Sequence, residues 1–171
     1  MGRPSQENDS EPETKASFTA NSEHYSPGKT FRLELKLTHP AGLHSYYRNP
    51  GTVGLPLEAS LKAPAGFEVQ GPYWSIPHVG ESVGEVYYGY SAPVFTWYVT
   101  PSSSASGDAV FEAAASWQLC GNEGGLPPSE PSHYSLTPSP GAGTEISPDP
   151  STPRDSNINP STEALPFAAQ Q

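Results

Sequence analysis

The amino-acid sequence predicts an all-β protein built as a two-layer sandwich, and three observations support this fold class. Apolar and polar residues alternate with period two over several short runs, a pattern typical of strands that bury one face. Turn-forming residues separate these runs at intervals of ~8–12 residues, as in β-sandwiches. The 171 residues also include 16 glycines and 21 prolines but only 15% charged residues, a composition that favours strands joined by turns over helices.

The strongest strand prediction covers residues 31–37, where phenylalanine and leucine alternate with charged residues. A second alternating run covers residues 57–63. The aromatic run 71–77 has a proline near each end, which favours an edge strand or a loop because proline cannot donate to a sheet ladder. Residues 78–86 are rich in glycine and are predicted to form a loop. Further short strands are predicted at residues 44–48, 67–69, 86–90, 93–100, 109–119 and 133–137.

Composition divides the chain into three parts. Residues 1–17 are polar and acidic and are predicted to be a disordered tail. Residues 138–171 are rich in proline and serine with little apolar periodicity, which predicts a second disordered tail or a linker. Residues 18–137 are predicted to form one domain, and their length of about 120 residues suffices for a single two-layer core.

The charge pattern excludes some classes of partner. The formal net charge is −10, and lysine and arginine form no cluster, so binding to nucleic acid or to an anionic membrane surface is not expected. No apolar run approaches the ~18 residues that span a bilayer. Residues 1–17 do not have the pattern of a signal peptide, so we do not expect export through this N-terminus.

Cys120 is the only cysteine in the sequence, which excludes an intramolecular disulfide and a cysteine-rich zinc site. It lies at the end of a predicted strand, beside a glycine-rich loop that ends in Pro127 and Pro128. A thiol held partly exposed in such a loop, near backbone N–H groups, is favoured as a thiolate. The alternative interpretation is that Cys120 is a small buried apolar residue, as most free cysteines are.

Other chemistries receive less support. The five histidines, at positions 24, 39, 44, 78 and 133, show no i, i+2 or i+4 spacing, so no metal site is predicted. No nucleophile-elbow motif indicates a hydrolase. The many tyrosines and tryptophans suit either a sugar-binding platform or packing between sheets, and packing is favoured because buried aromatic rings contribute a large apolar area.

One set of motifs runs through the predicted domain in a defined order. The motifs lie at residues 40–51 (PAGLHSYYRNPG), 54–56 (GLP), 64–67 (PAGF), 74–77 (WSIP), 88–90 (YGY) and 120–128 (CGNEGGLPP). In their order and spacing they resemble the N-terminal domain of DsbD-type thiol:disulfide interchange proteins. The resemblance covers the chain from about Ala16 to Thr137 and rests on the whole set, since no single motif is specific.

This resemblance implies an immunoglobulin-like β-sandwich with disordered N- and C-terminal tails and a location in the periplasm. It also implies a role in a relay that passes reducing equivalents from a membrane-embedded partner to oxidised substrate proteins. The implied partners are therefore proteins of a thiol–disulfide relay. Contact with a membrane occurs only through a partner, and neither nucleic acid nor a small-molecule cofactor is involved.

Within the redox segment, the resemblance assigns Cys120 as the redox thiol and places Gly125 where one branch of the family has its second cysteine. The neighbouring candidates for shielding and loop positions are His44, Tyr88, Tyr90 and Pro127. Two functions stay open, because resolving a mixed disulfide within the domain needs a second thiol. The domain is either a redox-impaired protein-interaction module or a module that retains exchange through mixed disulfides between Cys120 and a partner protein.

Overall fold

A computed structural model describes residues 13–51, 55–82, 84–121, 124–143 and 145–146. Every regular element in these ranges is a β-strand, which confirms the all-β prediction. No helix in the described ranges is long and apolar enough to cross a membrane. The predicted disordered segments at residues 1–12 and 147–171 lie outside the described residues.

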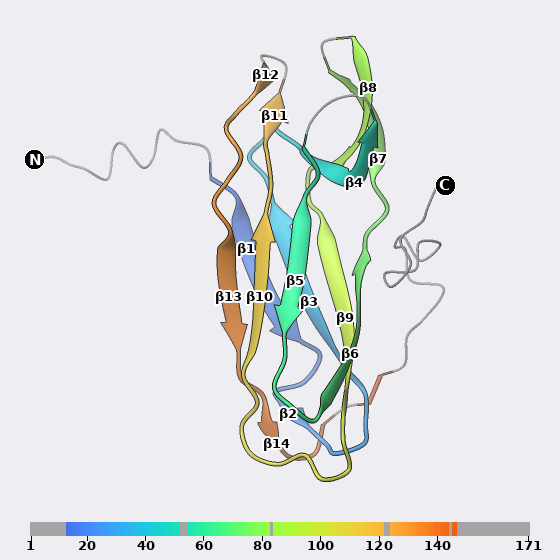
Figure 1. The fold of residues 1–171 in the computed structure, drawn as a ribbon, viewed down its shortest axis with the longest axis vertical. Helices are drawn as coiled ribbons and strands as arrows, with labels where there is room; N and C mark the ends of the chain where they lie inside the picture. Colours follow the sequence, from blue (N-terminus) through green and yellow to red (C-terminus); the bar gives the residue numbers. More distant parts are fainter. Residues whose placement is uncertain (1–12, 52–54, 83, 122–123, 144, 147–171) are drawn as a thin grey trace, which may run out of the picture.

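Two antiparallel sheets form an immunoglobulin-like sandwich, as predicted (Figure 1). One sheet has the order β1-β3-β9-β6 and the other has the order β13-β10-β5. The strands are β1 (Lys15–Ala20), β2 (His24–Tyr25), β3 (Phe31–Thr38), β4 (Ser45–Gly51), β5 (Glu58–Lys62), β6 (Phe67–Trp74), β7 (His78–Ser82), β8 (Glu85–Tyr90), β9 (Val94–Pro101), β10 (Phe111–Ser116), β11 (Cys120–Gly121), β12 (Gly124–Gly125), β13 (Ser132–Leu136) and β14 (Ser139–Pro140).

Strand alternation places the core between the two sheets. On β3 and β10 every second residue is buried, and the residues between them are partly or fully exposed. The rings of Phe31 on β3 and Phe111 on β10 meet edge to face across the layers, with centroids 5.8 Å apart. The other fully buried core residues of these strands and of β9 are Leu33, Leu35, Leu37, Phe95, Trp97, Val99 and Ala113.

The strand predictions for residues 31–37, 57–63 and 93–100 are confirmed by β3, β5 and β9. The loop prediction for residues 78–86 is wrong, because β7 pairs with β8 from His78 to Ser82. Glycine at position 80 is needed for packing in this hairpin and does not form a turn. A Cβ atom there would overlap the ring of Tyr87, so the ring lies directly on the bare backbone.

Both predicted tails include residues that form strands in the structure. β1 pairs with β3 from Lys15 onward, inside the tail predicted at residues 1–17. The Phe18 ring packs edge to face on Trp97 at 6.4 Å, and this contact holds the strand on the sandwich. At the other end β14 pairs with β2, inside the tail predicted at residues 138–171. Ile146 then donates its N–H to the Thr30 carbonyl at 2.9 Å.

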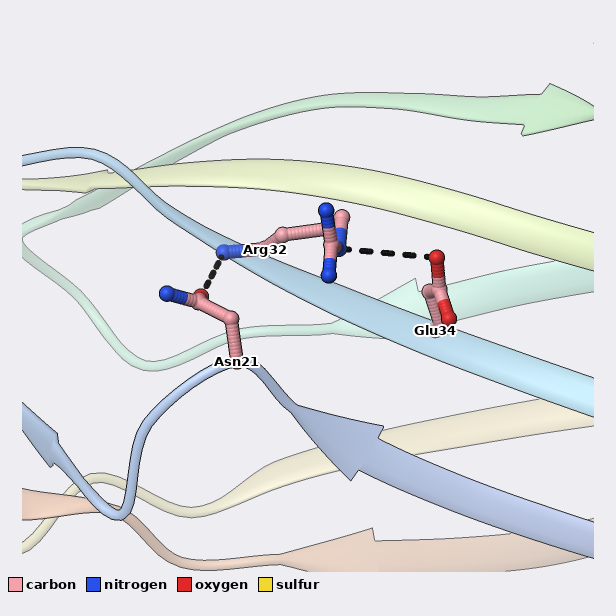
Figure 2. A network of polar contacts seen from close by, with 3 residues as sticks. All are labelled: Asn21, Arg32 and Glu34. Carbon is pink, nitrogen blue, oxygen red and sulfur yellow. Dashed lines mark hydrogen bonds and ion pairs between the residues drawn. The ribbon is translucent and has the colours of Figure 1, made fainter. Parts of the chain in front are cut away.

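Asn21 extends the pairing of β1 and β3 by one residue. Its backbone N–H donates to the Arg32 carbonyl at 3.1 Å, and its side-chain oxygen accepts the Arg32 N–H at 2.6 Å (Figure 2). On the same strand the Arg32 guanidinium lies 3.4 Å from the Glu34 carboxylate. Because this ion pair is partly exposed, it contributes little to stability.

The smaller strands lie at the two ends of the sandwich. Figure 1 shows β4, β7, β8, β11 and β12 at one end, while β2 and β14 lie at the other. At the first end β4, β8 and β7 form a three-stranded sheet, and β11 pairs with β12. This end carries Cys120, the candidate redox thiol.

Candidate functional site

The backbone of Cys120 is fixed on both sides. On one side its N–H donates to the His44 carbonyl at 2.9 Å, and the His44 N–H donates to the Cys120 carbonyl at 3.0 Å. On the other side Cys120 pairs with Gly125. The hydrogen bond that joins these two segments lies one residue further along, where the Leu126 N–H donates to the Leu119 carbonyl at 2.8 Å. Directly paired antiparallel residues point to the same face. His44, Cys120 and position 125 therefore form a row on one face.

Three aromatic rings lie around the thiol. Cys120 is buried together with Tyr46 and Tyr87 in a small apolar cluster separate from the main core. The His44 ring stacks on Tyr87, with centroids 4.0 Å apart and planes 2° apart, and meets Tyr46 edge to face at 5.1 Å. We call Cys120, His44, Tyr46 and Tyr87 the thiol cluster. The cluster leaves only 6% of Cys120 exposed.

Two glycines make room for the Tyr87 ring. Gly80 lies opposite Tyr87 on β7, and Gly89 lies opposite Tyr46 on β4. A Cβ atom on Gly80 would overlap the Tyr87 ring, and one on Gly89 would overlap the Ser45 carbonyl. The bare backbone at both positions therefore lets the ring lie flat over the sheet, where it reaches the thiol.

Burial and neighbouring groups keep the two phenols and the imidazole of the thiol cluster neutral. Burial raises the pKa of the Tyr46 phenol, and a hydrogen bond with the Cys120 side chain raises it further. Burial, and then the proximity of Cys120, raises the pKa of Tyr87. Burial, and then the neighbouring His78, lowers the pKa of His44. At neutral pH the phenols therefore keep their protons, so Tyr46 donates a hydrogen bond to the sulfur. The imidazole of His44 is uncharged at this pH.

Gly125 leaves a space beside the sulfur. A Cβ atom at this position would lie 3.0 Å from the Cys120 Sγ. A disulfide, with its S–S bond of about 2.05 Å, holds each sulfur about 3 Å from the Cβ of the other cysteine. In non-hydrogen-bonded antiparallel pairs the Cα atoms also approach to about 4.5 Å, within the range for disulfides. Position 125 thus has the geometry of a disulfide partner, although it carries no side chain.

Gln118 holds the loop that carries Gly125. Its amide nitrogen donates to the Leu126 carbonyl at 3.2 Å, and its oxygen accepts the Leu55 N–H at 3.0 Å. The side chain therefore ties the residues before β5 to the residue after β12. This tie keeps Gly125 next to Cys120.

The structure brings together some of the residues that the sequence pointed to. His44 and Gly125 flank Cys120. Cys120 itself is buried, which agrees with the second interpretation of the sequence, a small buried apolar residue, and not with a partly exposed thiol. The predicted loop residue Pro127 is exposed.

The shielding expected from Tyr88 and Tyr90 is also corrected. Tyr88 is 41% exposed, because alternation along β8 turns it away from Tyr87. Tyr90 belongs to the main core, where its hydroxyl donates to the Ser75 carbonyl at 2.7 Å. Sequence reasoning missed Tyr46 and Tyr87 as the shield. The sequence held one signal for them. Tyr46 is two residues from His44 and Tyr87 is two residues from Gly89, and residues two apart on a strand share a face.

A second buried histidine lies next to the site. His39 Nδ1 lies 2.8 Å from the Thr14 hydroxyl, and its Nε2 lies 2.7 Å from the Ser45 hydroxyl. Burial, and to a smaller extent His44, lowers the pKa of His39 from 6.5 to about 4. His39 is therefore neutral and acts as a structural bridge between the N-terminal segment and β4.

This shift predicts that the domain loses stability in acid. Between pH 6.5 and about 4 the unfolded chain binds a proton at His39 that the folded chain does not, so the free energy of unfolding falls as the pH falls. The full shift corresponds to about 3 kcal/mol. Urea unfolding at several pH values across this window measures the slope, and His39→Gln is expected to flatten it. A wild-type profile that is flat in this window contradicts the assignment.

The fold and the site define the class of this protein as an immunoglobulin-like sandwich with one thiol under aromatic cover. No protein-family model matches the sequence, and no curated protein matches it. Among solved structures the chain is similar to the N-terminal periplasmic domain of ScsB from Proteus mirabilis. The TM-score is 0.48 and the identity 20%, over 74% of this chain and 46% of that one, so this chain spans less than half of the ScsB chain.

Two further solved structures are similar to this chain. One is the reduced n-terminal domain of Neisseria meningitidis DsbD, with a TM-score of 0.41 and 12% identity over 76% of this chain and 90% of that one. The other is AvmM, described as catalysing macrocyclization in alchivemycin A biosynthesis, with a TM-score of 0.38 and 9% identity over 77% and 91%.

Proposed function

We propose that this domain is a protein-binding module of a thiol–disulfide exchange system that no longer cycles as a two-electron carrier. The observation that carries the proposal is the pair Cys120 and Gly125. Position 125 has the geometry of a disulfide partner for Cys120, yet the chain has one cysteine. A thiol relay needs one sulfur to attack and a second to resolve the mixed disulfide.

Exposed apolar side chains at the same end of the sandwich support protein binding. Leu55 and Leu126 are 51% and 43% exposed and are tied together by Gln118. Val79 and Val86 are 64% and 48% exposed on the hairpin that supplies Tyr87. Apolar side chains gathered in this way are typical of surfaces that contact other proteins. The motif resemblance implies that the partner belongs to a periplasmic relay and that any membrane contact is made by that partner.

Reduction of insulin disulfides by dithiothreitol, followed by turbidity, tests the loss of redox cycling. We expect the purified wild-type domain to leave the rate at that of dithiothreitol alone, and Cys120→Ser to behave in the same way. Thermal unfolding of both proteins confirms that they are folded. Catalysis by the wild-type domain that disappears in Cys120→Ser contradicts the proposal, because it shows that one thiol suffices for turnover.

One observation favours a second function, the formation of mixed disulfides between Cys120 and a partner protein. Although Cys120 is buried, the neighbouring Gly125 is exposed and has no side chain to cover the sulfur. The first step of exchange needs only one attacking thiolate, which this chain retains. In this function the domain captures a partner covalently and depends on another thiol for release.

A further inference from the structure

His44 carries a buried nitrogen without a hydrogen-bond partner. Its side chain is 8% exposed, and within the described part of the chain its Nε2 is the one buried side-chain nitrogen or oxygen that lacks a hydrogen bond. Leaving such an atom unpaired is unfavourable, so an unpaired nitrogen here calls for a functional reason. The mixed-disulfide chemistry of the second proposed function supplies one.

The position of this nitrogen points to the thiol. His44 and Cys120 are a hydrogen-bonded antiparallel pair, so both side chains leave the same face of the sheet. The His44 ring packs on Tyr87 and against Tyr46, which are the two rings that enclose Cys120. The unpaired Nε2 therefore belongs to a ring of the thiol cluster, the same cluster that holds the Cys120 thiol.

Gly125 gives the route by which a second sulfur reaches Cys120. The three aromatic side chains cover the thiol on the His44 side of the row, and Gly125 is exposed on the other side. The space there begins where a Cβ atom would lie, 3.0 Å from the sulfur. A partner's sulfur that occupies this space takes the place that a second cysteine of the domain would have.

We infer that Cys120 is a site of mixed-disulfide formation that is reached across Gly125, with His44 Nε2 as the acceptor of the thiol proton. This inference rests on the second proposed function. In the reaction the Cys120 proton moves to His44, and the thiolate attacks a low-molecular-weight or protein disulfide. The S–S bond of that disulfide breaks as the bond to Cys120 forms, and the leaving thiolate takes the proton from His44. One disulfide is consumed and one is formed, so no further oxidant is needed.

The neutral state of His44 agrees with this role, because its lowered pKa leaves it free to accept a proton at pH 7. The titratable groups around it are Tyr46 and Tyr87, which its ring contacts, His78, which lowers its pKa, and its strand partner Cys120. His39 also lies close enough for His44 to lower its pKa. Both phenols stay protonated, so the imidazole is the one basic group next to the thiol among the described residues.

Reaction of the full chain with 5,5′-dithiobis(2-nitrobenzoic acid) tests the inference, with release of the coloured thiolate as the readout. Gly125→Ala places a methyl group in the access space, and we expect its rate constant to fall about tenfold, equivalent to ~1.4 kcal/mol of activation free energy. The backbone at 125 is not in the left-handed region, so alanine brings no backbone strain, and the Cys120 sulfur 3.0 Å from its methyl group has to shift slightly. Val110→Ala, exposed at the far end of β10, is the control.

His44→Phe keeps the ring stacked on Tyr87 and removes Nε2. We expect its rate constant to fall about tenfold or more at pH 7 and to approach the wild-type value in alkaline solution, where hydroxide takes the thiol proton in place of His44. A merely structural role would lower the rate equally at every pH. His133→Phe, at an exposed histidine of β13, is the matched control.

These experiments distinguish a failure of the second proposed function from a failure of the further inference about His44 and Gly125. A wild-type chain that releases no coloured thiolate until it is denatured overturns the second proposed function and this inference with it. A reactive wild-type chain with unchanged rates in Gly125→Ala, or with the same pH profile in His44→Phe, overturns the inference alone. Mass spectrometry after incubation with glutathione disulfide checks that the adduct is on Cys120.

Discussion

Replacement of Gly125 by cysteine is expected to produce a disulfide with Cys120 on exposure to air. The two positions form a non-hydrogen-bonded cross-strand pair, and the new Cβ lies 3.0 Å from the existing sulfur, where a disulfide requires it. The loop that the bond closes is short, so the gain in the free energy of unfolding is about 2 kcal/mol. Thiol titration of the denatured, non-reduced chain is expected to find no free thiol.

Gly124→Cys is the matched control for this variant. Gly124 pairs with Gly121, one residue along from the pair Cys120 and Gly125, so a side chain introduced at this position is expected to leave the opposite face of the ladder. We expect this variant to keep both thiols free under the same conditions. If Gly125→Cys also keeps both thiols free, position 125 does not have the geometry of a disulfide partner, and the observation that carries the proposed function fails with it. If the disulfide forms, the same variant is expected to catalyse insulin reduction.

The sequence predicted the sandwich well because its signal is local. In residues 31–37 the alternation of apolar and charged residues determines which face of β3 is buried, whatever the strand pairs with. Proline near both ends of residues 71–77 correctly indicated an edge, since β6 lies at the edge of its sheet. The motif order then pointed to the position of Gly125 opposite Cys120 before any pairing was known.

The parts that sequence reasoning missed depend on contacts between distant residues. In the sequence Gly80 looks like a turn residue. Its pairing with Tyr87 shows instead that the absence of a Cβ atom makes room for the tyrosine ring. Tyr87, Tyr88 and Tyr90 are chemically alike, so the register of β8 against β4 decides which of them faces Cys120. The unpaired Nε2 of His44 likewise follows from burial, which the spacing of histidines along the chain does not report.

The Tyr87→Ala variant is expected to unmask the thiol and to destabilise the domain. The Tyr87 ring is 7% exposed, stacks on His44 at 4.0 Å and lies over Gly80 and Gly89. Because its removal leaves a cavity beside Cys120, we expect the free energy of unfolding to fall by about 3 kcal/mol. We also expect the thiol to react at least about tenfold faster, a decrease of ~1.4 kcal/mol in activation free energy.

Tyr88→Ala distinguishes this effect from a general loosening of the hairpin. Tyr88 is adjacent on β8 but 41% exposed, and it points away from the thiol cluster. Its substitution is expected to change the free energy of unfolding by no more than about 0.5 kcal/mol and to leave the reactivity of Cys120 unchanged. If both variants raise the reactivity equally, the hairpin covers the thiol as a whole, and Tyr87 has no special part in it. A selective effect of Tyr87→Ala shows that one ring, seated on two glycines, sets the exposure of the only thiol.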